Sequence, residues 1–343
     1  MNFYFRISLN AGLGHLFRCI NIAKELKKNN INSTFILEKN SPKLNQFIKK
    51  NIRSVYFINE NLKLKDELNK LEEIFKLSKK KIYLLIDGYN FNYNYQKKIK
   101  SKVYKLIVIS DIPNTRYCCD ILINPNLKDN TQKYKRLVQK KTKIFSGKKY
   151  ILINDYDKKI KDEIKRKRKN FTKIKNVLIS FGGDANHKLI FLSLNFLFFS
   201  KFENLKIYIT VNKNTKIPMI KKFKTKFKII LLEEVYNLSS YYKSCDLAIG
   251  GCGHSTWERS ISMIPSICIN LAKNQNLISN LLIKTKSAFV FESKNLKLFE
   301  QFIINKMYVL QEKKFYLNYA NNISCLIQKK PLSKLVNKII KNK

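Results

Sequence analysis

The fold of this chain is decided near its beginning by residues 10–19, NAGLGHLFRC. This stretch follows an apolar segment, residues 3–8, and leads into a segment with Ile20, Ala23 and Leu26 at helical spacing. A strand, a glycine turn and a helix in this order direct backbone N–H groups and a helix N-terminus toward an anion. The stretch therefore predicts the first βα unit of a sheet, with a ligand site at its edge.

His15 lies where the predicted strand gives way to the helix. The neighbouring Gly12 and Gly14 permit turn conformations and close backbone approaches. An imidazole at such an edge can reach a bound ligand, and its usual pKa of about 6.5 suits proton transfer near neutrality. The same position also suits a histidine that caps the helix of an ordinary βα turn. The stretch alone leaves both interpretations open.

From the length, composition and absence of targeting signals, we expect a two-domain cytoplasmic protein. A length of 343 residues favours two domains, and 45% hydrophobic residues are enough for packed cores. There is no uninterrupted apolar run of the roughly 20 residues that a membrane span needs, and Arg6 and Asn10 interrupt any resemblance to a secretory signal. The seven cysteines form no C-x-x-C pair, so we expect reduced core residues and no metal site.

The net charge is strongly positive, with 68 Lys and Arg against 24 Asp and Glu, or +44. Such a charge is typical of nucleic-acid-binding proteins. The lysines are spread along the whole chain, however, without an arginine-rich face or an aromatic stacking motif. We interpret them as residues of solvated faces whose field attracts anionic ligands such as nucleotides, and we do not expect nucleic acid as the partner.

Short apolar runs alternate with stretches of helical periodicity in the first half of the chain. We predict strands at residues 3–8, 33–38, 54–58, 81–87, 105–110 and 120–123, and helices at residues 15–29, 41–50, 63–78 and 92–102. This βαβα order is typical of a parallel sheet that is covered by helices.

The same order restarts after a basic interruption at residues 154–170. We predict strands at residues 176–180, 206–211, 227–232, 246–249, 266–270 and 288–291, a helix at residues 187–199, and further helices within residues 295–340. We therefore expect an α/β protein with two Rossmann-like domains facing across a cleft. The expected limits are residues 1–155 for the N-terminal domain, 156–172 for a linker with a hinge, 173–325 for the C-terminal domain, and 326–343 for a basic tail or helix.

Two acidic residues follow apolar strands of the first predicted domain. Asp87 comes after residues 83–86 and Asp111 after residues 106–110. The carboxyl ends of parallel strands are where ligands bind in open α/β sheets. Capping acids in βα turns explain each residue equally well.

The second informative stretch is residues 246–259, DLAIGGCGHSTWER. A strand ends in three glycines within four residues, including Gly251, and Ser255 and Thr256 then begin a helix. Such a turn exposes backbone donors that suit a diphosphate. Glu258 either accepts hydrogen bonds from the two hydroxyls of a ribose or is a first-turn acid favoured by the helix dipole.

Four further polar positions lie near the two glycine turns of the second predicted domain. Asn274 and Gln275 follow the strand at 266–270, where their amides either read sugar hydroxyls or cap the next helix. His254 either contacts phosphate or caps the helix, and the cap is slightly favoured. His187 is interpreted as a surface residue of its helix.

Together these motifs resemble a known family. Residues 180–184, SFGGD, residues 250–258 and residues 265–275 are similar to the nucleotide-binding half of the GT-B fold. With residues 12–19, the resemblance narrows to the PseG/SpsG-like nucleotide-sugar hydrolases of pseudaminic acid biosynthesis, relatives of the transferase that attaches N-acetylglucosamine to lipid intermediate I. It extends through residues 85–89, 109–111 and 119–126, and so covers most of residues 1–280.

The resemblance implies hydrolysis of a UDP-linked 2,4-diacetamido-2,4,6-trideoxy sugar to UDP and free sugar, with inversion and without a metal or other cofactor. His15 matches the catalytic histidine that activates water, and Asp87 and Asp111 join it, one of them orienting the imidazole. Backbone donors from Gly251 to Ser255 would hold the departing diphosphate. The expected substrate-binding residues are Gly12, Gly14, Arg18, Tyr89, Asn126, Gly182, Gly183, Gly251, Ser255, Thr256, Glu258, Asn274 and Gln275.

The chain also departs from the family pattern. The segment from Arg6 to the glycine turn lacks the usual acidic residue, and His254 replaces a small residue. The alternative function is a GT-B glycosyltransferase that passes the sugar to a lipid or polysaccharide acceptor, which the basic segment 63–81 and the +44 charge keep open. We expect a UDP-sugar as partner, no stable membrane insertion and a monomer. A basic protein that binds an anionic polymer would instead depend steeply on salt and not on His15.

Overall fold

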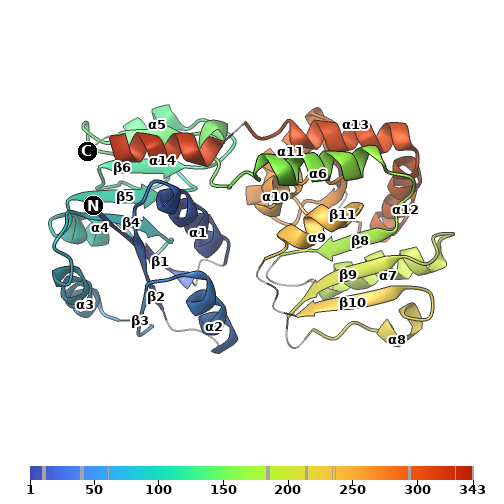
Figure 1. Ribbon diagram of the computed structural model, residues 1–343, viewed down its shortest axis with the longest axis horizontal. Helices are drawn as coiled ribbons and strands as arrows, with labels where there is room; N and C mark the ends of the chain where they lie inside the picture. The colour runs from blue at the N-terminus through green and yellow to red at the C-terminus, as the bar shows by residue number, and fades with distance from the viewer. Residues whose placement is uncertain are drawn as a thin grey trace. The chain divides into compact units, whose positions relative to one another are not determined.

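The computed structural model describes residues 1–9, 13–38, 42–60, 62–182, 186–212, 215–233, 235, 237–292, 295–328 and 330–341, apart from the side chains of Lys43, Asn274 and Lys297. The chain divides into two compact units (Figure 1). The first unit comprises Met1–Asn154 and Lys329–Lys343, and the second comprises Asp155–Gln328.

The first unit is built on a seven-stranded parallel sheet with the order β3-β2-β1-β4-β5-β6-β7. Its strands are β1 (Asn2–Ile7), β2 (Ser33–Glu38), β3 (Val55–Ile58), β4 (Ile82–Asp87), β5 (Lys105–Ile109), β6 (Ile121–Asn124) and β7 (Lys143–Ser146). The strand order reverses between β1 and β4, and the carboxyl ends of strands beside such a reversal are where α/β sheets bind ligands.

Helices cover both faces of this sheet (Figure 1). They are α1 (Leu13–Lys28), α2 (Pro42–Asn51), α3 (Leu64–Lys76), α4 (Tyr93–Lys100), α5 (Thr131–Lys135), the short 3₁₀ helix η2 (Lys148–Tyr150) and α14 (Pro331–Lys341). Alternate residues of β1 point to opposite faces. Tyr4 packs in one cluster with Leu71 of α3 and Tyr95 of α4. Arg6 lies two residues after Tyr4 and therefore points to the same face of the sheet.

The second unit repeats the architecture with six parallel strands in the order β10-β9-β8-β11-β12-β13. The strands are β8 (Asn176–Ser180), β9 (Lys206–Val211), β10 (Lys228–Glu233), β11 (Leu247–Gly251), β12 (Ser266–Ile269) and β13 (Phe289–Phe291). The helices are α6 (Lys158–Lys169), α7 (His187–Phe199), α8 (Ile220–Phe223), α9 (Ser239–Ser244), α10 (Ser255–Ile261), η3 (Lys273–Gln275), α11 (Asn276–Lys284), α12 (Lys297–Gln311) and α13 (Lys313–Ser324). The expected α/β class is confirmed.

Helices occupy both the expected linker region and the expected C-terminal tail or helix. Residues 156–172, expected as a linker, contain α6, which is held in the second unit by the buried Arg168. The Arg168 guanidinium donates hydrogen bonds to the backbone oxygens of Cys245, Tyr242 and Ser262 at 2.6–3.1 Å. The C-terminal segment forms α14, which packs in the first unit although the second unit precedes it in the chain.

Other sequence expectations concern cysteines, membranes and metals. Six of the seven cysteines are buried, Cys325 is exposed, and none is in a disulfide. Within the described ranges, no helix combines the length and the apolar character that crossing a bilayer requires. The described residues also contain no group of three His, Cys, Asp or Glu side chains placed to hold a metal ion.

Candidate functional site

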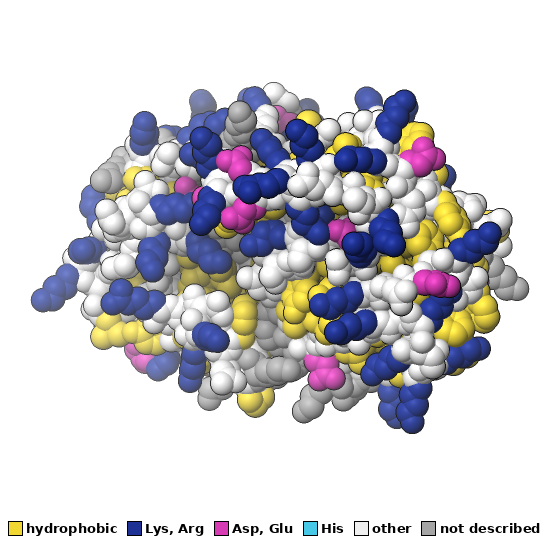
Figure 2. All heavy atoms as spheres, turned by 45° about the vertical axis from the view of Figure 1, so that its right-hand side comes forward, with side chains coloured by type: hydrophobic (Ala, Val, Ile, Leu, Met, Phe, Trp, Pro, Cys, Tyr) yellow, Lys and Arg dark blue, Asp and Glu magenta, His cyan; other side chains and the backbone are white. Residues whose placement is uncertain are grey.

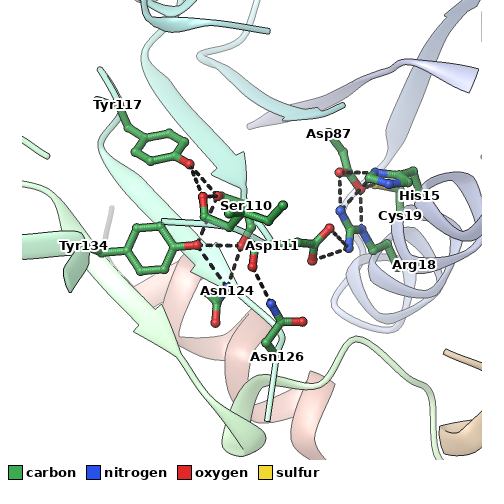
Figure 3. Close-up of polar contacts among 11 residues, drawn as sticks. His15, Arg18, Cys19, Asp87, Ser110, Asp111, Tyr117, Asn124, Asn126 and Tyr134 are labelled. Carbon is green, nitrogen blue, oxygen red and sulfur yellow. Dashed lines mark hydrogen bonds and ion pairs between the residues drawn. The ribbon is translucent and has the colours of Figure 1, made fainter. Parts of the chain in front are cut away.

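The first group of predicted residues is centred on Asp87, the last residue of β4 (Figure 3). Its side chain is fully buried. His15 Nδ1 lies 2.7 Å from Asp87 Oδ1, and Arg18 Nε donates to Asp87 Oδ2 at 2.6 Å. Burial alone would raise the pKa of Asp87, but the charge of Arg18 and the hydrogen bonds from Arg18 and His15 outweigh it and lower the pKa to about 2. Asp87 is therefore ionised at neutral pH.

These partners come from one face of α1. His15, Arg18 and Cys19 are three and four residues apart, which is the spacing of neighbours on a helix surface. All three are buried, and the Cys19 thiol lies 3.5 Å from Asp87 Oδ2. Because α1 begins beside the carboxyl end of β4, this face meets the Asp87 carboxylate.

The contacts of Asp87 fix the tautomer of His15. An ionised carboxylate only accepts hydrogen bonds, so the 2.7 Å contact places a proton on His15 Nδ1. Arg18 Nη2 lies 3.0 Å from the same nitrogen, but a guanidinium only donates, and Arg18 Nη2 donates instead to Asp87 Oδ1. In the neutral imidazole, the other ring nitrogen, Nε2, is then unprotonated and can accept a proton.

Arg18 joins Asp87 to the second predicted acid, Asp111, which follows β5. Arg18 Nη1 lies 2.9 Å from both carboxylate oxygens of Asp111. Burial disfavours the charge of Arg18, yet the two carboxylates raise its pKa well above the ordinary value. Two carboxylates and one guanidinium give the group a net charge of −1 when His15 is neutral.

The loop after β5 is held by a second polar network (Figure 3). Asn126 Nδ2 donates to the backbone oxygen of Asp111 at 2.5 Å, and Asn124 Nδ2 donates to that of Ser110 at 2.8 Å. The hydroxyl of Tyr134 lies 3.1 Å from Asn124 Nδ2. Asn126 thus positions the backbone that carries Asp111.

A cavity of about 170 Å³ adjoins these residues. His15, Arg18, Asp87 and Asp111 line it, together with Tyr89. The Tyr89 ring meets the His15 ring edge-on, with centroids 5.3 Å apart, and 65% of this tyrosine is exposed. The structure therefore brings together five of the predicted residues of the first unit, with Asn126 holding the backbone of one of them, Asp111. Gly12 lies outside the described residues.

Gly14 is the second residue of α1, and apart from its chain neighbours and its own helix backbone, no atom of the described residues lies within 4 Å of the place where a Cβ would be. Its site therefore has room for a side chain.

The second group of predicted residues surrounds the glycine turn of the second unit. A Cβ on Gly250 would lie 2.2 Å from the Ser180 carbonyl oxygen, so β11 requires glycine there to approach β8. A Cβ on Gly251 would lie 2.9 Å from Leu271 Cδ1. Gly182, just after β8, has a φ of +93°. Gly183 lies outside the described residues.

Arg259 and Gln275 hold this turn from within the protein. The buried Arg259 donates from Nη2 to the Gly251 oxygen at 2.7 Å and to Thr256 Oγ1 at 2.9 Å. Gln275 Oε1 accepts from the backbone N–H groups of Cys252 and Leu271 at 3.0 and 3.2 Å. Thr256 and Gln275, both predicted to bind substrate, thus make contacts that support the turn.

Glu258 lies in the first turn of α10, as expected, and is partly buried. Burial raises the pKa of its carboxyl group to about 7, against the opposing effect of the Arg259 charge. None of the described groups donates a hydrogen bond to this carboxylate. Ser255 begins α10, and His254 occupies the N-cap position before it, without a side-chain capping hydrogen bond.

Two remaining predictions concern Asn274 and His187. The side chain of Asn274 lies outside the described residues. His187 is exposed at the start of α7, as expected of a surface residue.

Sequence reasoning missed the residues that support the site. The Ser110 hydroxyl lies 2.7 Å from that of Tyr117 and 3.1 Å from that of Tyr134. Asn124 and Ser110 end or follow apolar strands, as Asp87 does, and that position is the signal that could have identified them. Arg259 carried a weaker signal, since it only followed Glu258.

Comparison with known proteins adds few sequence relatives. No protein-family model matches the chain. It is similar to the uncharacterized protein MJ1062 of Methanocaldococcus jannaschii, with 25% identity over 269 residues, which make up 76% of this chain and 54% of that protein. The chain thus spans about half the length of this curated relative.

Several solved structures are similar along the whole chain. UDP-GlcNAc 2-epimerase from Neisseria meningitidis bound to UDP-GlcNAc matches with a TM-score of 0.67 and 13% identity, covering 100% of both chains. MurG from Acinetobacter baumannii matches with a TM-score of 0.64 and 12% identity, covering 99% of this chain and 100% of that one. A glycosyltransferase from Rickettsia africae matches with a TM-score of 0.63 and 13% identity, covering 100% and 99%. The chain therefore has the GT-B fold that these structures share.

Proposed function

We propose that this chain is a nucleotide-sugar hydrolase that cleaves a UDP-linked diacetamido-trideoxy sugar into UDP and the free sugar. The observation that carries the proposal is the pair of His15 and Asp87, with a protonated Nδ1 held by an ionised carboxylate at 2.7 Å beside a cavity. In the neutral form of His15, the pair leaves Nε2 unprotonated, and such an atom is what a general base requires.

The reaction follows from that geometry. His15 Nε2 accepts a proton from water, the water oxygen forms a bond to the anomeric carbon, and the bond from that carbon to the diphosphate oxygen breaks. Asp87 stabilises the imidazolium that forms, and remains ionised because its pKa is about 2. Attack opposite the leaving group inverts the anomeric centre. Arg18, with its charge taken up by Asp87 and Asp111, is assigned a positioning role.

UDP is assigned to the turn between β11 and α10. The backbone donors from Gly251 to Ser255 would hold the diphosphate, and the carboxylate of Glu258 would accept hydrogen bonds from the ribose hydroxyls. The fold supports binding of a UDP-sugar, since the Neisseria meningitidis epimerase of the same fold was solved bound to UDP-GlcNAc. The pseudaminic acid substrate class rests on the motif resemblance of residues 12–19 and 250–275.

A glycosyltransferase is the second candidate. The His15–Asp87 pair can take a proton from an acceptor hydroxyl as readily as from water, and MurG has the same fold along 99% of this chain. Only the nature of the acceptor distinguishes the two reactions, so the decisive experiment omits an acceptor.

The test is release of UDP from a UDP-linked diacetamido-trideoxy sugar, with EDTA present and no acceptor. His15→Ala should lower the rate by about 10²–10⁴-fold, the usual contribution of a general base, while the affinity for UDP stays unchanged. His187→Ala, at an exposed position on α7, is the matched control and should retain full activity. Tight UDP binding without release by the unmodified chain would favour the transferase, and absence of UDP binding would overturn both candidates.

A further inference from the structure

A second cavity of about 300 Å³ opens at the carboxyl edge of the same sheet. Arg6 of β1, Glu38 of β2 and Glu67 of α3 line its floor. The loop between β4 and α4 borders both this cavity and the one beside His15, because Phe91 and Asn92 line each of them. The proposed reaction uses none of the three floor residues.

The floor is a buried and ordered cluster. Arg6, Glu38 and Glu67 are 2%, 5% and 8% exposed. Arg6 Nη2 donates to Glu38 Oε1 at 2.9 Å and Arg6 Nε donates to Glu67 Oε1 at 2.8 Å, while the guanidinium carbon lies 5.0 Å from the centroid of the Phe91 ring. The Tyr95 hydroxyl also donates to Glu67 Oε1, at 2.8 Å. These contacts fix the direction of each carboxylate.

The cluster leaves one acceptor open. Both contacts of the Glu67 carboxylate end on Oε1, so Oε2 accepts no hydrogen bond from the described residues although Glu67 lines the cavity. Glu38 is satisfied, because its Oε2 accepts from the backbone N–H of Leu9 at 2.9 Å. An accessible carboxylate oxygen on the wall of a cavity favours a ligand that donates hydrogen bonds.

The charge of the floor restricts the ligand further. Two carboxylates and one guanidinium leave a net charge of −1 in a chain whose total is +44. A phosphate or carboxylate ligand would be repelled there. The exposed rim instead offers neutral amides, from Asn59, Asn90, Asn92 and Asn94, and each amide both donates and accepts hydrogen bonds.

We propose that this cavity binds a neutral carbohydrate, with a ring hydroxyl donating to Glu67 and the rim amides contacting the other hydroxyls. The carbohydrate is either the glycosyl group of the nucleotide sugar, which rests on the proposed function, or a separate saccharide. In both cases the same groups recognise the carbohydrate. They are the negatively charged floor, with Glu67 Oε2 as hydrogen-bond acceptor, and the asparagine amides of the rim.

Binding is measured by saturation-transfer NMR, with the methyl glycosides of glucose, galactose, mannose and N-acetylglucosamine as separate probes and N-acetylneuraminic acid as the anionic probe. UDP and UDP-GlcNAc are titrated in parallel by calorimetry. The key variant is Asn94→Trp, which fills the cavity from its rim without touching the floor. Lys97→Trp, on the same helix but outside the cavity lining, is the matched control.

A separate saccharide site predicts that at least one neutral glycoside binds saturably in the presence of UDP, and that Asn94→Trp weakens this binding at least tenfold. A glycosyl site predicts that the same variant weakens UDP-GlcNAc at least tenfold and leaves UDP unchanged. Glu67→Gln, which replaces the open acceptor with a donor, should weaken the same ligand. Lys97→Trp should change neither affinity.

The proposal is overturned if Asn94→Trp leaves every affinity unchanged, or if N-acetylneuraminic acid binds in preference to the neutral sugars. Thermal unfolding of each variant separates lost binding from lost folding. If Glu67→Gln fails to fold, Asn94→Trp still decides the question. Because these readouts need no turnover, a failure of UDP release in the His15 experiment leaves the carbohydrate proposal intact, and the reverse also holds.

Discussion

Asp87 contacts three side chains of α1, and each contact constrains what the others can do. The carboxylate orients His15, neutralises Arg18 and accepts from the Cys19 thiol. Arg18 in turn holds Asp111 at 2.9 Å. A substitution at Asp87 therefore alters the contacts of the His15 imidazole directly, and those of Asp111 through Arg18.

Asp87→Asn keeps the shape of the side chain and removes its charge. We expect kcat for UDP release to fall by about 10²–10⁴-fold, because an amide that donates to His15 Nδ1 moves the imidazole proton to Nε2. Steady-state kinetics measure this effect, and Asp66→Asn, at an exposed position on α3, is the control. Full activity in Asp87→Asn would show that the tautomer does not matter.

Glu258 should make the protein less stable as pH rises, whereas an acid in an ion pair makes a protein more stable as pH rises. Burial raises its pKa from 4.5 to about 7, so the folded protein holds this proton more tightly than the unfolded chain does. The free energy of unfolding should then decrease as pH rises from about 4.5 to 7, by at most about 3 kcal/mol, and level off above that range. Denaturant unfolding of the unmodified chain and of Glu258→Gln at several pH values tests this, since the variant should lose that part of the slope.

The same carboxylate ties UDP affinity to pH. If it accepts from the ribose hydroxyls, binding favours the ionised form, and the affinity for UDP should rise as pH increases through 7. Glu258→Gln should bind UDP more weakly and without this dependence. An unchanged pH profile in the variant would contradict the ribose assignment.

At the scale of elements, the close approach of β8 and β11 depends on glycine. Gly250 and Gly14 make a matched pair. A Cβ at Gly250 would lie 2.2 Å from a backbone oxygen, whereas one at Gly14 would have no atom of the described part of the chain within 4 Å beyond its own helix backbone and chain neighbours. The two positions therefore predict opposite outcomes for the same substitution.

Gly250→Ala should lower the free energy of unfolding by about 2–4 kcal/mol, since β8 or β11 must shift. Gly14→Ala should leave it unchanged or raise it by up to about 1 kcal/mol, because alanine favours a helix over glycine. Thermal or denaturant unfolding measures both. Equal effects in the two variants would show that the approach of β8 and β11 tolerates a methyl group.

The sequence predicted those elements that its apolar runs mark. The strands of both sheets except β7 lie close to their expected limits, because continuous apolar runs bounded by polar turns are typical of buried parallel strands. β7, Lys143–Ser146, was missed because only Ile144 and Phe145 are apolar in it and lysine-rich segments flank it. Two apolar residues do not form a run that marks a strand.

The sequence predicted where the residues of the candidate site lie, but not which side chains contact one another there. The ends of β4 and β5 placed Asp87 and Asp111 at one sheet edge, and the glycine turn placed His15 there. That Arg18 would hold both acids, and that Tyr134 would support Asn124, depends on side chains that meet only in the folded protein. The docking of α14 in the first unit was hidden for the same reason.

For the whole molecule, the dominant feature is positive charge. Lys and Arg side chains are distributed over the whole face drawn in Figure 2, with fewer Asp and Glu among them. Such a field attracts anions over distances comparable to the Debye length, about 8–10 Å at moderate salt, and is screened as salt increases.

We expect UDP binding to weaken as NaCl rises from about 0.05 to 0.5 M, and uridine binding to stay nearly constant, because uridine carries no phosphate charge. Calorimetry at several salt concentrations measures both ligands. Equal salt dependence for UDP and uridine would show that the field does not act through the diphosphate. Binding to a random DNA duplex is measured over the same salt range. A loss of DNA binding far steeper than the loss of UDP binding would distinguish the effect on UDP from general binding of an anionic polymer.

The return of α14 to the first unit has a consequence for synthesis on the ribosome. The second unit is continuous, Asp155–Gln328, whereas the first is interrupted by it and includes residues from 329 onward. Leu335 and Val336 of α14 are fully buried there. The unit that emerges first can therefore complete its packing only after the unit that emerges second has left the exit tunnel.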